Sequence, residues 1–327
     1  MVIVMNNPRL NCMWVCLAST IVLAGCFGGK PAVIRSENQQ RAESTLIRGV
    51  RAEQKGAYPE AEKLLKEALT ISSSIEDYTV RITSLINLAR LHRLQHELPK
   101  SELFIDQALA LLKPGTLLSA EVFHEKALLE IAKGNPSKAL EWAQQAITSE
   151  QGNKRGSRSN LASRIHLALG NWSDADTLAR SALVDNRSAG HTEEEGNSLR
   201  IMGIVARNEK KHSEGERFLL EALSIDKRLG RSGKIAADLE ELAKTSQSSG
   251  NMKESAKYLE RAFDVNLAAG RSRQAQENQA MLAEIYVMLG DSFKAEKARE
   301  TARKLAVQGG SQQQPGSSVT INPSSRP

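Results

Sequence analysis

Small and apolar residues recur along most of this chain at a spacing typical of paired helices. Comparison of residues 56–69, 96–109, 250–263 and 290–303 aligns seven units of 36 to 40 residues, and each unit has a small residue followed seven positions later by alanine. The small residues are Ala61, Ser101, Ala139, Ala175, Gly215, Ser255 and Ala295, and the alanines are Ala68, Ala108, Ala146, Ala182, Ala222, Ala262 and Ala302. Twelve positions before the first series lie Gly49, Ala89, Ala127, Ser163, Gly203, Ala243 and Ala283. Because helices pack closely only where small side chains meet, each unit is predicted to be a helical hairpin.

Glycine and proline mark the ends of the predicted helices. One glycine series, with members 40 residues apart, falls where the second helix of a unit should end: Gly190, Gly230, Gly270 and Gly310. Another series marks the turn inside a unit: Gly56, Gly134, Gly170, Gly250 and Gly290. Pro59, Pro99 and Pro136 lie at the start of second helices, where a missing N–H is harmless. The spacing predicts about fourteen helices over residues 41–308, and Ser36 with Gln39 forms a candidate capping box for the first helix.

The repeat resembles the tetratricopeptide repeat in its longer form of about 40 residues, as in kinesin-light-chain-like and cell-polarity adaptor proteins. This resemblance implies an all-α fold, an α-solenoid of about seven helix-turn-helix repeats, in which stacked units bury faces that one unit leaves open. Aromatic residues usually fill the first helix of the consensus. Here His92, His166 and Ala206 take that place and only Tyr286 conforms, so related α-solenoids remain an alternative.

The amino terminus carries a different pattern. Residues 13–24 form an apolar run interrupted by Ser19 and Thr20, which is shorter than the roughly 20 residues of a spanning helix and suits a signal-peptide core of about 7–15. The motif LAGC at residues 23–26 resembles the lipobox of bacterial lipoproteins. The resemblance implies a signal peptide over residues 1–25, cleavage between Gly25 and Cys26, and lipidation of Cys26. An ordinary secretory signal or an uncleaved segment is the alternative.

Further features of the termini refine this prediction. Only Arg9 is positively charged before the apolar run, and translation from Met5 would give a conventional polar start. No aspartate follows Cys26, so the inner-membrane retention signal of many lipoproteins is absent and the outer membrane is favoured. Residues 26–40 are expected to be the lipidated N-terminus and tether. Residues 309–327 are rich in Ser, Gln and Pro, which predicts a disordered tail.

The composition restricts the classes of partner expected for this chain. The chain has 44 basic and 38 acidic residues, a net charge of +6 that is too dilute to indicate nucleic-acid binding. Aromatic residues make up 4% of the chain, which suits a helical protein rich in Ala and Leu. Of the three cysteines, Cys12 and Cys16 lie in the predicted signal peptide, so a chain cleaved before Cys26 can form no internal disulfide.

Candidate chemistry is sparse. His92 and His96 lie one helical turn apart and could bind zinc, but no third ligand is near in the sequence and His92 falls at a packing position. Ser224 and Lys227 match the Ser-x-x-Lys motif of serine hydrolases without its Ser-Asp-Asn companion. We therefore expect no metal, no cofactor and no catalytic residues, and keep an envelope hydrolase using Ser224 as the rival hypothesis.

The inner surface offers the remaining feature. In tetratricopeptide arrays the first helices line a concave groove, and the resemblance places on it Arg90, Arg93, Asn160, Arg164, Asn197, Arg200, Arg207 and Asn208, with Lys154, Arg155 and Arg158 at its mouth. Such side chains can hold carboxylates by charge-assisted hydrogen bonds. Glu121, Glu240 and Glu284 interrupt the patch, and a solvated charged face is the alternative.

These features together predict a protein without catalysis of its own. It would be a lipid-anchored scaffold of the bacterial cell envelope, facing the periplasm from the outer membrane, that binds other envelope proteins or peptides in its groove. A pilotin-like assembly factor for a pilus or secretion complex is the alternative among binding proteins.

Overall fold

The computed structural model describes residues 35–311, and over this range the chain forms fourteen α-helices and no β-strand. The helices are α1 (Glu37–Gln54), α2 (Tyr58–Ser74), α3 (Tyr78–Leu94), α4 (Leu98–Ala110), α5 (Ser119–Ala132), α6 (Pro136–Ser149), α7 (Arg155–Ala168), α8 (Trp172–Ala189), α9 (Thr192–Asn208), α10 (His212–Arg228), α11 (Ser232–Ser248), α12 (Met252–Ala268), α13 (Ser272–Met288) and α14 (Ser292–Ser311). Each odd-numbered helix and the even-numbered helix after it form one of the seven predicted units.

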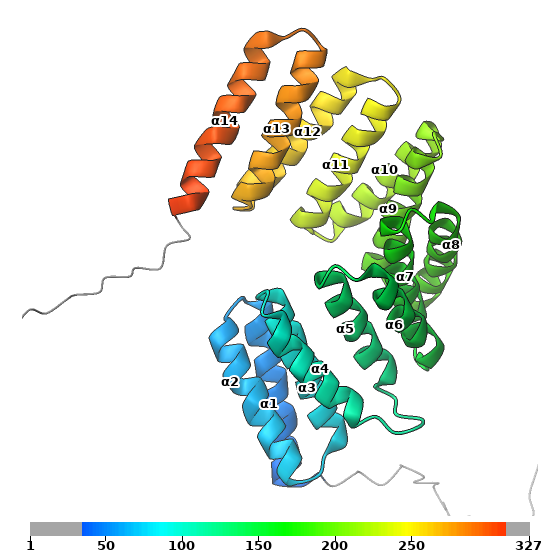
Figure 1. The fold of residues 1–327 in the computed structure, drawn as a ribbon, viewed down its shortest axis with the longest axis vertical. Helices are drawn as coiled ribbons and strands as arrows, with labels where there is room; N and C mark the ends of the chain where they lie inside the picture. The colour runs from blue at the N-terminus through cyan, green and yellow to red at the C-terminus, as the bar shows by residue number, and fades with distance from the viewer. Residues whose placement is uncertain (1–34, 312–327) are drawn as a thin grey trace, which may run out of the picture.

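The units stack in chain order into a curved solenoid. Each helix packs against the helices before and after it, and Figure 1 shows the pairs following an open arc whose two ends lie on the same side of the view. Successive first helices also touch one another directly, α7 with α9 and α9 with α11. This closer approach places the first helices on the inner, concave side. The prediction of an all-α solenoid is confirmed.

Small residues lie at the helix crossings, as the sequence predicts. Ala61, Ala139, Ala175 and Ala295 are fully buried, as are Ala68, Ala108, Ala146, Ala182, Ala222 and Ala262 in the second series. The helices approach closely between α9 and α10, where a Cβ on Gly203 would lie 2.6 Å from Leu219 Cγ. Ala302 in the last helix is only half-buried, since no unit packs over it within the described residues.

The ends of the array differ in detail from the predicted boundaries. The capping box at Ser36 is present, because its hydroxyl accepts from Gln39 N at 3.2 Å while Gln39 Oε1 accepts from Ser36 N at 2.8 Å. This cap starts α1 at Glu37, inside the segment 26–40 expected as a tether. At the other end Gly310 does not terminate a helix but lies within α14, which runs to Ser311. No further helix of the described chain follows, so nothing requires a turn at that glycine.

Buried polar side chains repeat at the interfaces between the later units. Each interface takes one residue from each of three helices: the first helix of a unit, the second helix of the same unit and the first helix of the next unit. We call such a set an interface triad. The three triads are Asn160–Asn186–Ser198, Arg200–Asp226–Asp238 and Glu240–Asn266–Asn278, related by shifts of 40 residues. Ser198 Oγ donates to Asn160 Oδ1 at 2.7 Å, and Asn278 Nδ2 donates to Glu240 Oε1 at 2.8 Å. A buried polar set that must pair across two units helps to fix their register.

Candidate protein-binding groove

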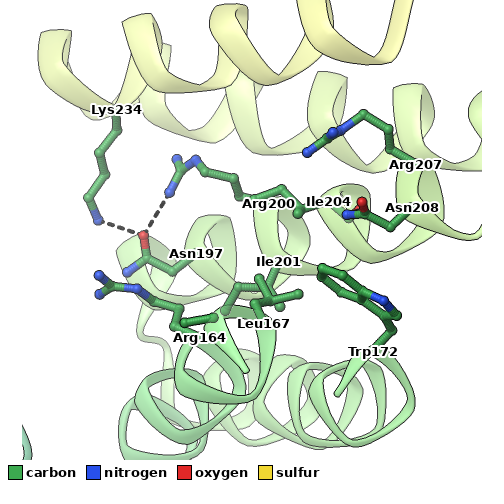
Figure 2. Close-up of a pocket in the computed structure, with 11 residues that line it drawn as sticks. Arg164, Leu167, Trp172, Asn197, Arg200, Ile201, Ile204, Arg207, Asn208 and Lys234 are labelled. Atoms are coloured by element: carbon green, nitrogen blue, oxygen red, sulfur yellow. Dashed lines mark hydrogen bonds between the residues drawn. The ribbon is translucent and has the colours of Figure 1, made fainter. Parts of the chain in front are cut away.

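A pocket of about 680 Å³ opens on the concave face between α7, α9 and α11. Its lining comprises Arg164, Leu167 and Ala168 of α7, Trp172 of α8, Asn197, Arg200, Ile201, Ile204, Arg207 and Asn208 of α9, and Lys234 of α11 (Figure 2). Five of the eight residues predicted for the groove are among them: Arg164, Asn197, Arg200, Arg207 and Asn208. A pocket of this size is in the usual range for a bound ligand.

One wall of the pocket is apolar, which the sequence analysis missed. Leu167 and Ile204 are half-buried, Ile201 is almost fully buried, and Trp172 at the start of α8 is 37% exposed. Figure 2 shows Trp172, Leu167 and Ile201 on the same side of the pocket, with Arg200 and Lys234 across from them. Trp172 lies in the first turn of a second helix. Placing it in the groove from the sequence would require knowing the curvature of the array.

Arg200 is bound within the fold and is not a free cation. Its Nε lies 2.5 Å from Asp238 Oδ1, and its Nη2 is bonded to Asp226 Oδ2, while both carboxylates are fully buried. The third donor, Nη1, reaches Asn197 Oδ1 at 3.0 Å, and Lys234 Nζ reaches the same oxygen at 2.9 Å (Figure 2). Arg200 therefore holds the groove wall, and three of its nitrogen atoms are already bonded to internal oxygens.

Asp238, one of the two carboxylates behind Arg200, has a raised pKa. Burial raises the pKa of Asp238 to about 7, against the opposing effect of the Arg200 guanidinium, and the neighbouring Asp226 raises it further. Asp226 Oδ1 and Asp238 Oδ2 are buried without a hydrogen-bond donor in the described structure. These atoms lie one layer behind the pocket wall.

Most other cations of the pocket are also paired. Arg207 Nη2 lies 3.0 Å from Glu241 Oε2, and Lys234 Nζ lies 2.9 Å from Glu193 Oε1. Arg164 differs, because its exposed side chain makes no hydrogen bond or ion pair with any described residue. Arg164 is therefore the cation that this pocket offers to an incoming anion.

The remaining predicted groove residues serve the fold elsewhere. Arg93 Nε and Arg90 Nε lie 2.6 Å and 3.5 Å from the carboxylate oxygens of the buried Glu125. These residues belong to the second and third units, whereas the pocket lies in the fourth to sixth units. Asn160 is buried, and its Nδ2 donates to the backbone oxygen of Glu194 at 2.9 Å. These three residues do not line the pocket. At the expected groove mouth, Lys154 and Arg158 both pair with Glu121 at 2.8 Å, while Arg155 is exposed and makes no ion pair with a described residue.

The sequence candidates for chemistry lie in ordinary structural positions. His92 is buried, its Nδ1 lies 2.6 Å from Glu97 Oε2, and its ring stacks on Phe104. Ser224 is exposed on α10, and its hydroxyl has no hydrogen-bond partner among the described residues. Over residues 35–311 no three His, Cys, Asp or Glu side chains are grouped to bind a metal ion. Nothing in this arrangement provides positive support for an enzyme.

The predicted anchor lies outside the described part of the chain. Gly25 and Cys26 both precede residue 35, so the structure does not test cleavage or lipidation. Among the helices that it does describe, none combines the length and the apolar character needed to cross a bilayer.

Comparisons with known proteins agree with the repeat architecture. Residues 48–113 match the family model of the tetratricopeptide repeat. The solved structures that resemble the chain include a signal transduction ATPase with numerous domains, with a tetratricopeptide repeat sensor, from Pyrococcus horikoshii. It has a TM-score of 0.66 and 16% identity, over 84% of this chain and 44% of that one. The chain thus spans less than half of that ATPase. No curated protein sequence matches the chain significantly.

Two further similar structures are Rap proteins. A Rap protein complexed with competence and sporulation factor has a TM-score of 0.64 and 17% identity, over 84% of this chain and 78% of that one. The apo form of RapI has a TM-score of 0.62 and 12% identity, over 82% and 77%. At these identities the likeness concerns the fold alone. The match at residues 48–113 and the fold of these neighbours agree with a solenoid of tetratricopeptide-like repeats.

Proposed function

We propose that this protein is a lipid-anchored scaffold of the bacterial envelope that binds a segment of another protein in the pocket between α7, α9 and α11. The observation that carries the proposal is the combination in one concave site of an apolar wall with the unpaired Arg164. A scaffold needs such a site, whereas the other basic residues of the pocket are paired with internal carboxylates.

The site favours a segment with an apolar side chain near a carboxylate. The apolar side chain would fill the space against Leu167, Ile204 and Trp172, whose burial supplies the binding energy. A nearby Asp, Glu or terminal carboxylate would pair with Arg164 by charge-assisted hydrogen bonds. The Rap structure supports the proposal, because that protein has a similar fold and is complexed with competence and sporulation factor.

The envelope location is supported by the sequence of the amino terminus. The LAGC motif at residues 23–26 follows a short apolar run, and lipidation of Cys26 would add acyl chains. Two or more chains give stable membrane anchoring, whereas one chain is marginal. With no aspartate after Cys26, the proposed address is the outer membrane, with the array in the periplasm.

Photocrosslinking in cells tests the groove. A photoreactive residue at Asn208, which is exposed and lines the pocket, is compared with one at Lys257, which is exposed on the second helix α12. We expect a discrete crosslinked protein from position 208 only, and we expect Arg164→Glu to abolish it while Lys257→Glu leaves it unchanged. Crosslinks from position 257 alone would move the binding surface to the convex face. A secretin-type ring subunit as the captured protein would favour the pilotin-like alternative.

Metabolic labelling with a fatty-acid analogue tests the anchor separately. The full chain should be labelled and should fractionate with the outer membrane, and Cys26→Ala should lose both properties. Cys16→Ala is the matched control, since Cys16 lies within the proposed signal peptide. Labelling that survives Cys26→Ala would exclude the proposed lipidation site.

A further inference from the structure

The interface between the fifth and sixth units contains two acidic residues where the neighbouring interfaces have neutral ones. The positions of Asp226 and Asp238 correspond to Asn186 and Ser198 one unit earlier and to Asn266 and Asn278 one unit later. Asp226 and Asp238 have 0% exposure, and they share the single guanidinium of Arg200. Two ionised carboxylates with one cation would leave a net negative charge in the interior, which burial strongly disfavours.

One oxygen of each of the two carboxylates is also free to carry a proton. Asp226 Oδ1 and Asp238 Oδ2 are buried and accept no hydrogen bond from any described residue, while the other oxygen of each carboxylate is bonded to Arg200. A proton on one of these free oxygens would remove the excess charge and could be donated to its neighbour, as in other close carboxyl pairs.

We infer that Asp226 and Asp238 share one proton at neutral pH, and that release of this proton loosens the interface between the fifth and sixth units beside the groove pocket. The arrangement of Arg200 with one carboxylate and one carboxylic acid is neutral. After release, one uncompensated negative charge remains between α9, α10 and α11, and opening of the interface exposes it to water.

Among residues 35–311, Arg200 is the only ionic partner of the two aspartates. On α9, Glu193 is paired with Lys234 of α11 and with Arg231, so neither cation is bonded to the two aspartates. On α10, Lys227 and Arg228 are exposed. From α12, packed on the other side of α11, no described charged side chain bonds to either aspartate. The pKa of Asp238, raised by burial and by Asp226, agrees with proton sharing.

The consequence for the groove rests on the proposed function. Arg200 links the pair to the pocket wall, because its Nη1 donates to Asn197 Oδ1 (Figure 2). Loss of the proton adds a negative charge directly behind that wall and destabilises the interface that shapes it. A protein segment bearing a carboxylate should therefore bind more weakly as the pH rises through neutrality.

Carbon NMR of the aspartate carboxyl groups tests the shared proton without any ligand. In the full chain, we expect one aspartate signal to titrate near neutrality, and Asp238→Asn should remove it. In Asp226→Asn the remaining Asp238 pairs one-to-one with Arg200 without its acidic neighbour, so the midpoint of this signal should shift to lower pH, while burial still holds the pKa of Asp238 above its usual range. Because Asn occurs at both positions in the next interface, the variants should fold. If all aspartates of the wild type titrate in the acidic range, the inference is overturned.

Hydrogen exchange tests the loosening. For a pair with a closed-state midpoint near neutrality and an ordinary open-state pKa, opening should become about tenfold more frequent between about pH 6 and about pH 8, after correction for intrinsic exchange. We expect this at the end of α10 and the start of α11, and not in Asp238→Asn. The interfaces at Asn186–Ser198 and Asn266–Asn278 are internal controls. A flat profile in the wild type would overturn the proposed loosening of the interface. Because the experiment uses no partner, its result can be interpreted even if the groove proposal fails.

Discussion

The close crossing of α9 and α10 permits a sharp test of the packing, because α9 contains two buried glycines in different surroundings. A Cβ built on Gly203 would lie 2.6 Å from Leu219 Cγ and 3.1 Å from the Gly215 backbone oxygen. A Cβ on Gly196, two turns earlier, would meet its nearest neighbour, Ile225 Cγ2, at 3.4 Å, which is ordinary contact. Leu219 is fully buried and has no free space to move into.

The two substitutions by alanine should therefore differ in their effect on the free energy of unfolding. Alanine in a helix interior is favoured over glycine by about 1 kcal/mol, and this gain is common to both sites. At Gly203 the new methyl group must displace Leu219 or separate the helices, and overpacking of this kind costs about 1–3 kcal/mol. We expect Gly196→Ala to be stabilising and Gly203→Ala to be less stable than Gly196→Ala by about 1–3 kcal/mol, because the propensity gain cancels in the comparison.

Urea unfolding followed by circular dichroism measures this difference. Solenoids can unfold in stages, so hydrogen exchange of α9 and α10 should be measured alongside the global transition. A double variant with Leu219→Ala should relieve most of the overpacking at Gly203. Equal stability of Gly203→Ala and Gly196→Ala would mean that the helices do not approach as described, and the register of the repeat would need revision.

Two further substitutions test the backbone and the buried charges. Lys210 has φ 62° at the turn position where the next unit has Gly250 with φ 84°. Lys210→Gly should therefore stabilise the fold by about 1 kcal/mol and Gly250→Lys should destabilise it by a similar amount, which thermal unfolding measures. Equal melting of both variants would refute the assigned strain. Arg93→Ala removes the closest partner of buried Glu125 and should cost about 3 kcal/mol in chemical unfolding, whereas Lys66→Ala, from an exposed pair, should cost under about 1 kcal/mol. Similar losses in the two variants would show that Glu125 is not dependent on Arg93.

The fold could be predicted because its determinants are local and repeated. A small side chain at Ala175 or Ala222 is required by the helix crossing itself, so its position in the sequence reports directly on the structure. The capping box at Ser36 is equally local, since both of its hydrogen bonds join residues three apart. The turn predicted at Gly310 is absent because this glycine lies within α14, and no described unit follows that helix to enforce a turn.

The chemistry of the groove depended on pairings that the sequence does not display. Arg200 was correctly placed on the concave side, but its partners Asp226 and Asp238 lie 26 and 38 residues further along on other helices. Residue spacing predicts which face a side chain occupies, and it does not reveal whether a carboxylate from the next unit will neutralise it. For the same reason Arg164 could not be distinguished beforehand from its paired neighbours.

The interface triads make the order of the units part of the information in the sequence. Each triad takes two residues from one unit and one from the next, and Asp238 is matched by Arg200 in the unit before it. A duplicated sixth unit would place Glu240 against Asp238 with no guanidinium between them, since Glu240 occupies the position of Arg200. The uncompensated buried charges would disfavour that pairing. Identical packing by small residues therefore builds the solenoid, and the differing triads determine which unit can follow which.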